Sequence, residues 1–179
     1  SMVNGKTCLV TKDTEVRDID TLRLILQAAP TLTCSLRTAA LQVNANMPAT
    51  FEWTGPAFFF SAQANPTVSL PGQYTLFART TGGCTASASI TVQENIVSPN
   101  IAVVDGVLRC ASPTVQLDVV NNGPQSALVY KWTGPNGFIS DIKSPGVSVP
   151  GNYTVVVTNP ANGCTISATA TILLDAVTP

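Results

Sequence analysis

The sequence has no histidine, and only 11% of its 179 residues carry a charge. The commonest acid–base residue near neutral pH is therefore missing, and neither a Gly-x-Ser-x-Gly stretch nor a phosphate-binding Gly-rich loop occurs. Nine Lys and Arg against ten Asp and Glu give a net charge of −1, with no basic stripe for nucleic acid or an anionic membrane surface. We expect no enzyme, no cofactor and no nucleic-acid partner.

Long apolar runs and helical periodicity are also scarce. No run of eighteen apolar residues occurs and no basic, then apolar, leader opens the chain, so the sequence predicts no membrane insertion. Helical spacing appears only in residues 18–29, and we favour a strand at 22–27 because the equivalent stretch 100–104 is β-branched and ends in a turn. Alternating apolar and polar residues predict further strands at 41–45, 74–78, 86–92, 115–119, 153–157 and 165–172.

A repeated motif shows how the chain is organised. The segment Trp-Thr-Gly-Pro at 53–56 returns at 132–135, and each copy is followed by Pro-Gly-x-Tyr-Thr and then by Gly-Cys. A repeat of about eighty residues indicates a tandem array of similarly folded units. We place these units at residues 18–97 and 98–179, and read 1–17 as a tag remnant plus the last strand of a truncated preceding unit.

Five cysteines fall at regular positions in the repeat. Two per unit predict one disulfide per unit, Cys34 with Cys84 and Cys110 with Cys164, formed in an oxidising compartment and stabilising each unit by about 3–4 kcal/mol. The alternative joins Cys8 to Cys34 and Cys84 to Cys110 across the constant interval of 26 residues between units. Under the first pairing Cys8 is free or links chains. Without histidine or a Cys-x-x-Cys, zinc is disfavoured.

The repeated aromatic residues allow two interpretations. Trp53 and Trp132 could each offer a ring face to a sugar, but a tryptophan at the end of a sandwich strand more often packs against the facing sheet. Phe58 stands opposite Gly137 of the other copy, so it is the better candidate for an exposed, ligand-binding aromatic. Phe59 is repeated in the second copy and should be part of the core.

The remaining polar candidates also have structural interpretations. Tyr74 and Tyr153 should bury their rings and bond their hydroxyls to a loop backbone. The acidic stretch 13–20, with Asp18 and Asp20, could supply oxygen ligands to Ca²⁺ between units, but a solvated linker is favoured. We expect no other metal site.

The motif as a whole resembles a known group of repeats. Residues 110–172 contain Cys, Trp-Thr-Gly-Pro-Asn-Gly-Phe, Val-Ser-x-Pro-Gly-x-Tyr-Thr-Val-x-Val and Asn-Gly-Cys-Thr in order. This is similar to the tandem PKD-like or Ig-like repeats of large secreted or surface adhesin-type proteins of Bacteroidetes-type bacteria. The resemblance implies an all-β fold of tandem Ig-like (PKD-like) β-sandwiches of about seven strands each, in an extracellular or cell-surface protein.

Two functions follow from this reading. The first is a structural or adhesive repeat module, a spacer or adhesin stalk whose partners are neighbouring repeats and, in addition, a surface glycan or protein. The alternative is a carbohydrate-binding accessory module of an extracellular polysaccharide-degrading enzyme. We expect a monomer in either case.

Overall fold

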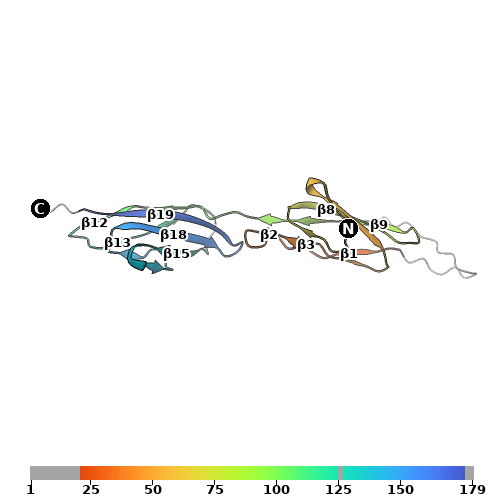
Figure 1. The fold of residues 1–179 in the computed structure, drawn as a ribbon, viewed down its shortest axis with the longest axis horizontal. Coiled ribbons are helices and arrows are strands. Elements are labelled where there is room, and N and C mark those ends of the chain that lie inside the picture. The colour runs from red at the N-terminus through yellow and green to blue at the C-terminus, as the bar shows by residue number, and fades with distance from the viewer. Residues whose placement is uncertain (1–20, 125–126, 176–179) are drawn as a thin grey trace, which may run out of the picture. The chain divides into compact units, whose positions relative to one another are not determined.

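The computed structural model describes residues 21–124 and 127–175, which form strands joined by turns. The chain divides between Asn95 and Ile96 into two compact units, each described by itself below (Figure 1). The repeat pattern predicts this boundary two residues further on, between residues 97 and 98. The strand predicted for a truncated preceding unit, in residues 1–17, lies outside the described residues.

The first unit consists of strands of two to eight residues and one single-turn 3-10 helix, η1. Its elements are β1 (Leu24–Leu26), β2 (Leu32–Thr33), β3 (Ala39–Ala40), β4 (Val43–Ala45), β5 (Thr50–Gly55), η1 (Pro56–Phe58), β6 (Phe59–Ser61), β7 (Thr67–Val68), β8 (Gly72–Arg79), β9 (Thr85–Val92) and β10 (Glu94–Asn95).

The second unit repeats this order, except that the single strand β19 takes the place of β9 and β10. Its elements are β11 (Ile101–Val103), β12 (Gly106–Leu108), β13 (Val115–Gln116), β14 (Val119–Asn121), β15 (Val129–Thr133), η2 (Pro135–Gly137), β16 (Ile139–Ser140), β17 (Gly146–Val147), β18 (Gly151–Asn159) and β19 (Cys164–Leu174).

Each unit is a sandwich of two layers. In the first, the larger layer has the order β6-β5-β8-β9, all antiparallel, and the pairs β1-β4 and β3-β7 form the facing layer. In the second, β16-β15-β18-β19 repeats the larger layer, with β11-β14 and β13-β17 facing it. A short strand runs parallel to the last strand in both units: β2 lies along the two-residue β10, and β12 lies along the end of the long strand β19. A tryptophan on the central strand of the larger layer packs toward the facing layer, so each unit is an Ig-like β-sandwich.

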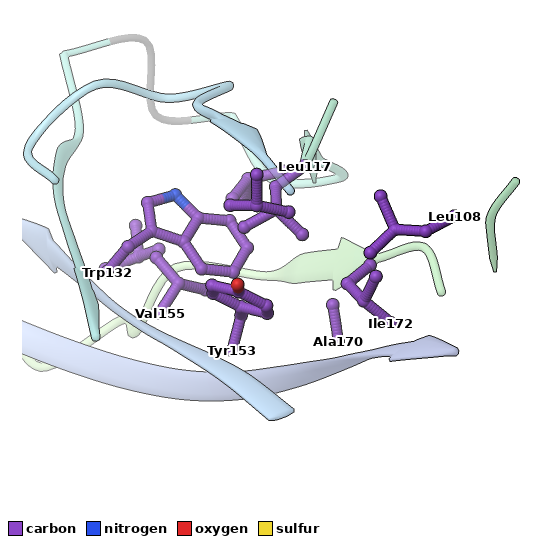
Figure 2. Close-up of a cluster of buried hydrophobic side chains, with 10 residues drawn as sticks. Leu108, Leu117, Trp132, Tyr153, Val155, Ala170 and Ile172 are labelled. Carbon is purple, nitrogen blue, oxygen red and sulfur yellow. The ribbon is translucent and has the colours of Figure 1, made fainter. Parts of the chain in front are cut away.

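The alternating pattern along the strands builds the core between the layers. In β18 the buried apolar residues are Tyr153, Val155 and Val157, and the residues between them face outward. Figure 2 shows the core of the second unit, where the indole of Trp132 and the ring of Tyr153 lie side by side at one end, and Ala170, Ile172 and Leu108 lie at the other. The first unit has the corresponding cluster, and also a smaller one of Leu22, Ala78 and Cys84.

Most strands lie where the sequence pattern predicts them. The stretch 22–27 contains a strand, β1, and not the alternative helix, since its pairing with β4 satisfies the backbone. The prediction of a single strand over 115–119 is wrong: β13 pairs with β17, β14 pairs with β11, and the chain changes partners at Leu117 and Asp118. Leu117 is nevertheless fully buried, so the apolar face continues through the break.

Candidate functional site

Both copies of the repeated motif form the same interlocked structure around a buried tryptophan. Trp53 and Trp132 are each 0% exposed, and each indole Nε1–H donates to a backbone carbonyl, of Ala64 at 3.2 Å and of Lys143 at 3.3 Å. The prediction of core packing is confirmed. The alternative prediction, that these tryptophans bind a ligand, is wrong, because a fully buried ring has no face to offer a sugar.

The tyrosine of the motif lies next to the tryptophan and closes a loop. The hydroxyl of Tyr74 donates to the carbonyl of Leu70 at 2.9 Å, and that of Tyr153 to Val149 at 2.8 Å. Phe59 packs its ring edge-to-face on Tyr74, with 5.3 Å between ring centroids, as its counterpart does on Tyr153 at 5.2 Å. Burial raises the pKa of Tyr74, and its bond to Leu70 only partly offsets this. Both tyrosines and Phe59 therefore have the structural roles predicted for them.

The glycines and prolines of the motif fill the space around this tyrosine. A Cβ on Gly55 would collide with the ring of Tyr74. Gly72 has a φ of +133°, and a Cβ there would lie 2.7 Å from Cγ of Pro56. The second unit repeats both close approaches with its own glycines. The repeated Gly-Pro and Pro-Gly pairs therefore serve one packing arrangement. None of these repeated glycines and prolines is left to act in binding or catalysis.

The two units differ at the turn that follows the tryptophan strand. Residues 56–59 and 135–138 form the same four-residue turn, closed by a hydrogen bond from the last N–H to the proline carbonyl. Its two central residues have positive φ, which is the type I′ turn favoured by Asn-Gly. The second unit has Asn136-Gly137 there, at φ 55° and 74°. The first has Ala57-Phe58, at φ 52° and 59°.

Phe58 is the most exposed aromatic side chain at this turn, as predicted. Its exposed fraction is 102%, and that of Phe60 two residues later is 63%. Phe60 pairs with Thr54 across the outer face of the sheet. Two phenylalanines therefore project from one hairpin of the first unit, where the second unit has Gly137 and Ile139.

The prediction of a disulfide inside each unit is wrong. In the first unit, Cys34 follows Thr33, which pairs with Asn95, whereas Cys84 precedes Thr85 at the start of β9. Asn95 stands ten residues further along the extended chain than Thr85, or about 33 Å. A disulfide needs Cα atoms within about 7 Å, so the two cysteines stand at opposite ends of the sandwich.

The second unit has the same arrangement. Cys164 begins β19, and Leu108, two residues before Cys110, pairs with Leu174 at the other end of that strand. Cys110 is free and exposed, while Cys34, Cys84 and Cys164 are disulfide-bonded. The alternative pairing of Cys84 with Cys110 is excluded by the same free thiol. The other half of that alternative, Cys8 with Cys34, involves a residue outside the described part of the chain.

Charged groups of the described residues meet at two places. One is an exposed ion pair, in which Nε of Arg109 lies 3.4 Å from a carboxylate oxygen of Asp175. The other is a small cluster around Asp118. The hydroxyl of Ser144 donates to the carboxylate of Asp118, and Nζ of Lys143 lies 3.7 Å from the same oxygen. These contacts lower the pKa of Asp118, the bond from Ser144 having the larger effect. Within residues 21–124 and 127–175 no group of three or more Cys, Asp or Glu is placed to hold a metal ion. The calcium candidates Asp18 and Asp20 lie outside these residues.

A hollow of about 460 Å³ lies beside β1, between it and β9. Its walls are mainly apolar, with one charged side chain, Arg23. It brings together no pair of groups suited to acid–base or nucleophilic chemistry. In the described part of the chain no helix is long and apolar enough to cross a membrane.

Sequence reasoning missed the separation of the cysteines. The feature that could have located the cysteines is the short strand before the first cysteine of each unit, which pairs in parallel with the last strand. Such a strand lies along the end of the last strand and not along its beginning, where the second cysteine stands.

Comparison with known proteins finds no matching family model and no matching curated protein. Solved structures with a similar arrangement include extracellular domains 3–5 of Drosophila OTK, with 13% identity and a TM-score of 0.43 over 86% of this chain. The I67–I69 fragment of the titin I-band has 14% identity and a TM-score of 0.47 over 88% of this chain. The IG1+IG2 structure of DIP-gamma has 11% identity and a TM-score of 0.44 over 88% of this chain and 99% of its own. The chain spans 62% of the OTK fragment and 66% of the titin fragment.

Proposed function

We propose that this chain is a structural or adhesive module: two Ig-like units of a tandem array that serves as a spacer or stalk in an extracellular or cell-surface protein. The observation that carries this proposal is that the repeated aromatic, glycine and proline residues serve internal packing in both units. What is copied is a folding unit and not a reactive site, as expected of an array whose length and stiffness are its useful properties.

The chemistry of the surface and of the sulfurs also supports an extracellular spacer. Three of the described cysteines are disulfide-bonded, which is typical of an oxidising compartment. The outer face of the larger layer has rows of small hydroxyl residues, such as Thr54, Thr75 and Ser89 in the first unit and Thr133, Thr154 and Thr169 in the second. The motif resembles repeats of adhesin-type bacterial surface proteins, and this resemblance implies the same spacer or adhesive role.

Pulling on the two ends of the full chain tests this function. In a reducing buffer, which removes disulfide constraints, a load-bearing array should show two separate unfolding events. Each should release the contour length of about eighty residues, or roughly 270 Å of extended chain before the folded length is subtracted. A chain that extends without force peaks would contradict a load-bearing role.

The turn at Phe58 favours a second candidate function, carbohydrate binding. Left-handed backbone at a residue with a side chain costs about 1–2 kcal/mol, and nothing inside the unit covers Phe58 in return. An exposed aromatic face held on a rigid hairpin suits stacking on a sugar ring, with hydroxyls such as that of Thr54 nearby to accept or donate hydrogen bonds.

Glycan-array binding of the intact chain tests this second function. Phe58→Gly and Phe60→Ala should each abolish glycan binding while the chain stays folded, because neither side chain belongs to the core. The matched control is Ile139→Ala in the second unit, which should leave binding unchanged. Equal binding by all variants, or binding to no glycan on the array, would eliminate this candidate and leave the spacer.

A further inference from the structure

The first cysteine of each unit occupies the same place in the fold. Residues 32–43 align without a gap with 108–119, which puts Cys34 opposite Cys110. Each cysteine is the second residue of a four-residue turn after the parallel edge strand. The turns are closed by equivalent bonds, from Thr33 N–H to the carbonyl of Leu36 at 2.8 Å and from Arg109 N–H to that of Ser112 at 3.1 Å. We refer to Cys34 and Cys110 as the turn cysteines.

The two turn cysteines differ in their chemical state. Cys34 is half-buried and disulfide-bonded, whereas Cys110 is exposed and free. The partner of Cys34 is not Cys84, which lies at the far end of the same sandwich, and it is not Cys110, which has no bond. Cys34 is therefore disulfide-bonded to a cysteine outside its own sandwich.

The second cysteine of each unit lies in a different environment. We call Cys84 and Cys164 the hairpin cysteines: Cys84 directly precedes β9, Cys164 is the first residue of β19, and they are 3% and 0% exposed. A neighbouring side chain fixes the backbone of each: Cys84 N–H donates to Oγ1 of Thr80 and Cys164 N–H to Oδ1 of Asn162, both at 3.0 Å. Both hairpin cysteines are disulfide-bonded. Each unit thus carries a turn cysteine at one end and an anchored hairpin cysteine at the other.

We propose that Cys110 is a covalent linkage site, whose thiol forms a disulfide with the hairpin cysteine of another unit of the same repeat. This inference rests on the tandem-array function proposed above. Two thiols become one S–S bond, releasing two protons and passing two electrons to a disulfide oxidant such as oxidised glutathione, which is reduced to two thiols. The link would restrain one unit against another, in addition to the peptide connection between them.

A chain extended by one unit tests this inference. Pro179 corresponds to Pro99, so the full chain followed by a second copy of residues 100–179 preserves the spacing of the existing junction. The added copy carries Cys110→Ser, so that Cys110 of the original chain gives a peptide of its own. After equilibration in a glutathione redox buffer, Cys110 should change from fully alkylatable to less than about one tenth alkylatable. Peptide mapping should find it joined to the added copy of Cys164.

Two variants of the extended chain provide the controls. Cys110→Ser should leave the added hairpin cysteine open to alkylation. Ser112→Cys in the Cys110→Ser background moves the thiol to the end of the turn, and it should not restore the link because the position in the turn matters. The increase in near-UV circular dichroism over that of the original chain reports whether the added unit, with its own tryptophan, is folded. A folded added unit with Cys110 still fully alkylatable would overturn the linkage, as would Cys110 joined only to glutathione or to a second chain. Either result would leave the force-bearing function to its own test.

Discussion

The two units share a fold and a packing motif but differ in the turn after the tryptophan strand. The second unit fills a type I′ turn with Asn136-Gly137, the residues that tolerate positive φ best. The first places Ala57-Phe58 in the same backbone conformation and exposes the phenylalanine completely. Strain of this kind persists when the surrounding structure or a function requires it. The comparison separates residues that every unit needs from residues that distinguish one unit.

A second difference lies at the loop that accepts the indole bond. In the first unit the amide oxygen of Asn65 accepts a hydrogen bond from Val43 N–H at 3.0 Å. In the second the equivalent loop has Ser144, which bonds to Asp118 beside Lys143. The loop is fixed by a neutral amide in one unit and by a charge-assisted bond in the other, so only the second should respond to pH at this place.

The largest expected effect comes from removing the tryptophan that both units share. Trp53→Ala and Trp132→Ala should each cost about 3–5 kcal/mol in the unit that carries the change, because the cavity left behind cannot fully collapse. Hydrogen exchange followed by mass spectrometry should show lost protection in β5 and β8 for the first variant and in β15 and β18 for the second. Loss of protection throughout the chain in both variants would show that the units do not unfold separately.

Placing a methyl group under the tyrosine ring should have the next largest effect. Gly55→Ala and Gly134→Ala should each destabilise their own unit by about 1–3 kcal/mol, because the added Cβ meets Tyr74 or Tyr153. The measurement is the denaturant midpoint of each unit by the same exchange method. Gly146→Ala is the control, since its nearest neighbour is the side chain of Gln116 at 3.7 Å. If the control matches Gly55→Ala, crowding at the ring is not the cause.

Exchanging the turns tests the main difference between the units. Ala57→Asn with Phe58→Gly should stabilise the first unit by about 1–2 kcal/mol, and Asn136→Ala with Gly137→Phe should destabilise the second by a similar amount. Thermal unfolding of each double variant gives the sign. Opposite signs are required by the strain argument; a first unit that becomes less stable would mean that Phe58 makes stabilising contacts in solution.

The smallest expected effect concerns Asp118 and depends on pH. Because Ser144 and Lys143 hold the pKa of this carboxyl below its ordinary value, the ionised group stabilises the second unit above the unfolded pKa of about 3.9. That contribution is lost as pH falls through the lower, folded pKa. Asp118→Asn should therefore cost no more than about 1 kcal/mol at pH 7, and less as the solution becomes acidic. Denaturation of both proteins at pH 7 and pH 3 gives the comparison; a pH-independent difference would contradict it.

The sequence pattern predicted much of the fold and part of the candidate site. Alternation located the long strands because each has one buried and one exposed face, as β8 and β18 show. Comparing the two copies assigned Phe59 to the core and Phe58 to the surface, and both assignments are confirmed. The ligand-binding role of Phe58 stays a prediction, because exposure shows only that the ring is available.

The sequence by itself determined the β class, the repeated unit and the aromatic core, because alternation and repetition are local properties that a one-dimensional pattern records. Only the tertiary structure decided which cysteines lie close enough to form a disulfide. Spacing along the chain made Cys110 and Cys164 look like partners, whereas the parallel pairing of β12 with the end of β19 puts them at opposite ends of the sandwich. Disulfide formation depends on distance in space, which the register of the strands sets and the number of intervening residues does not.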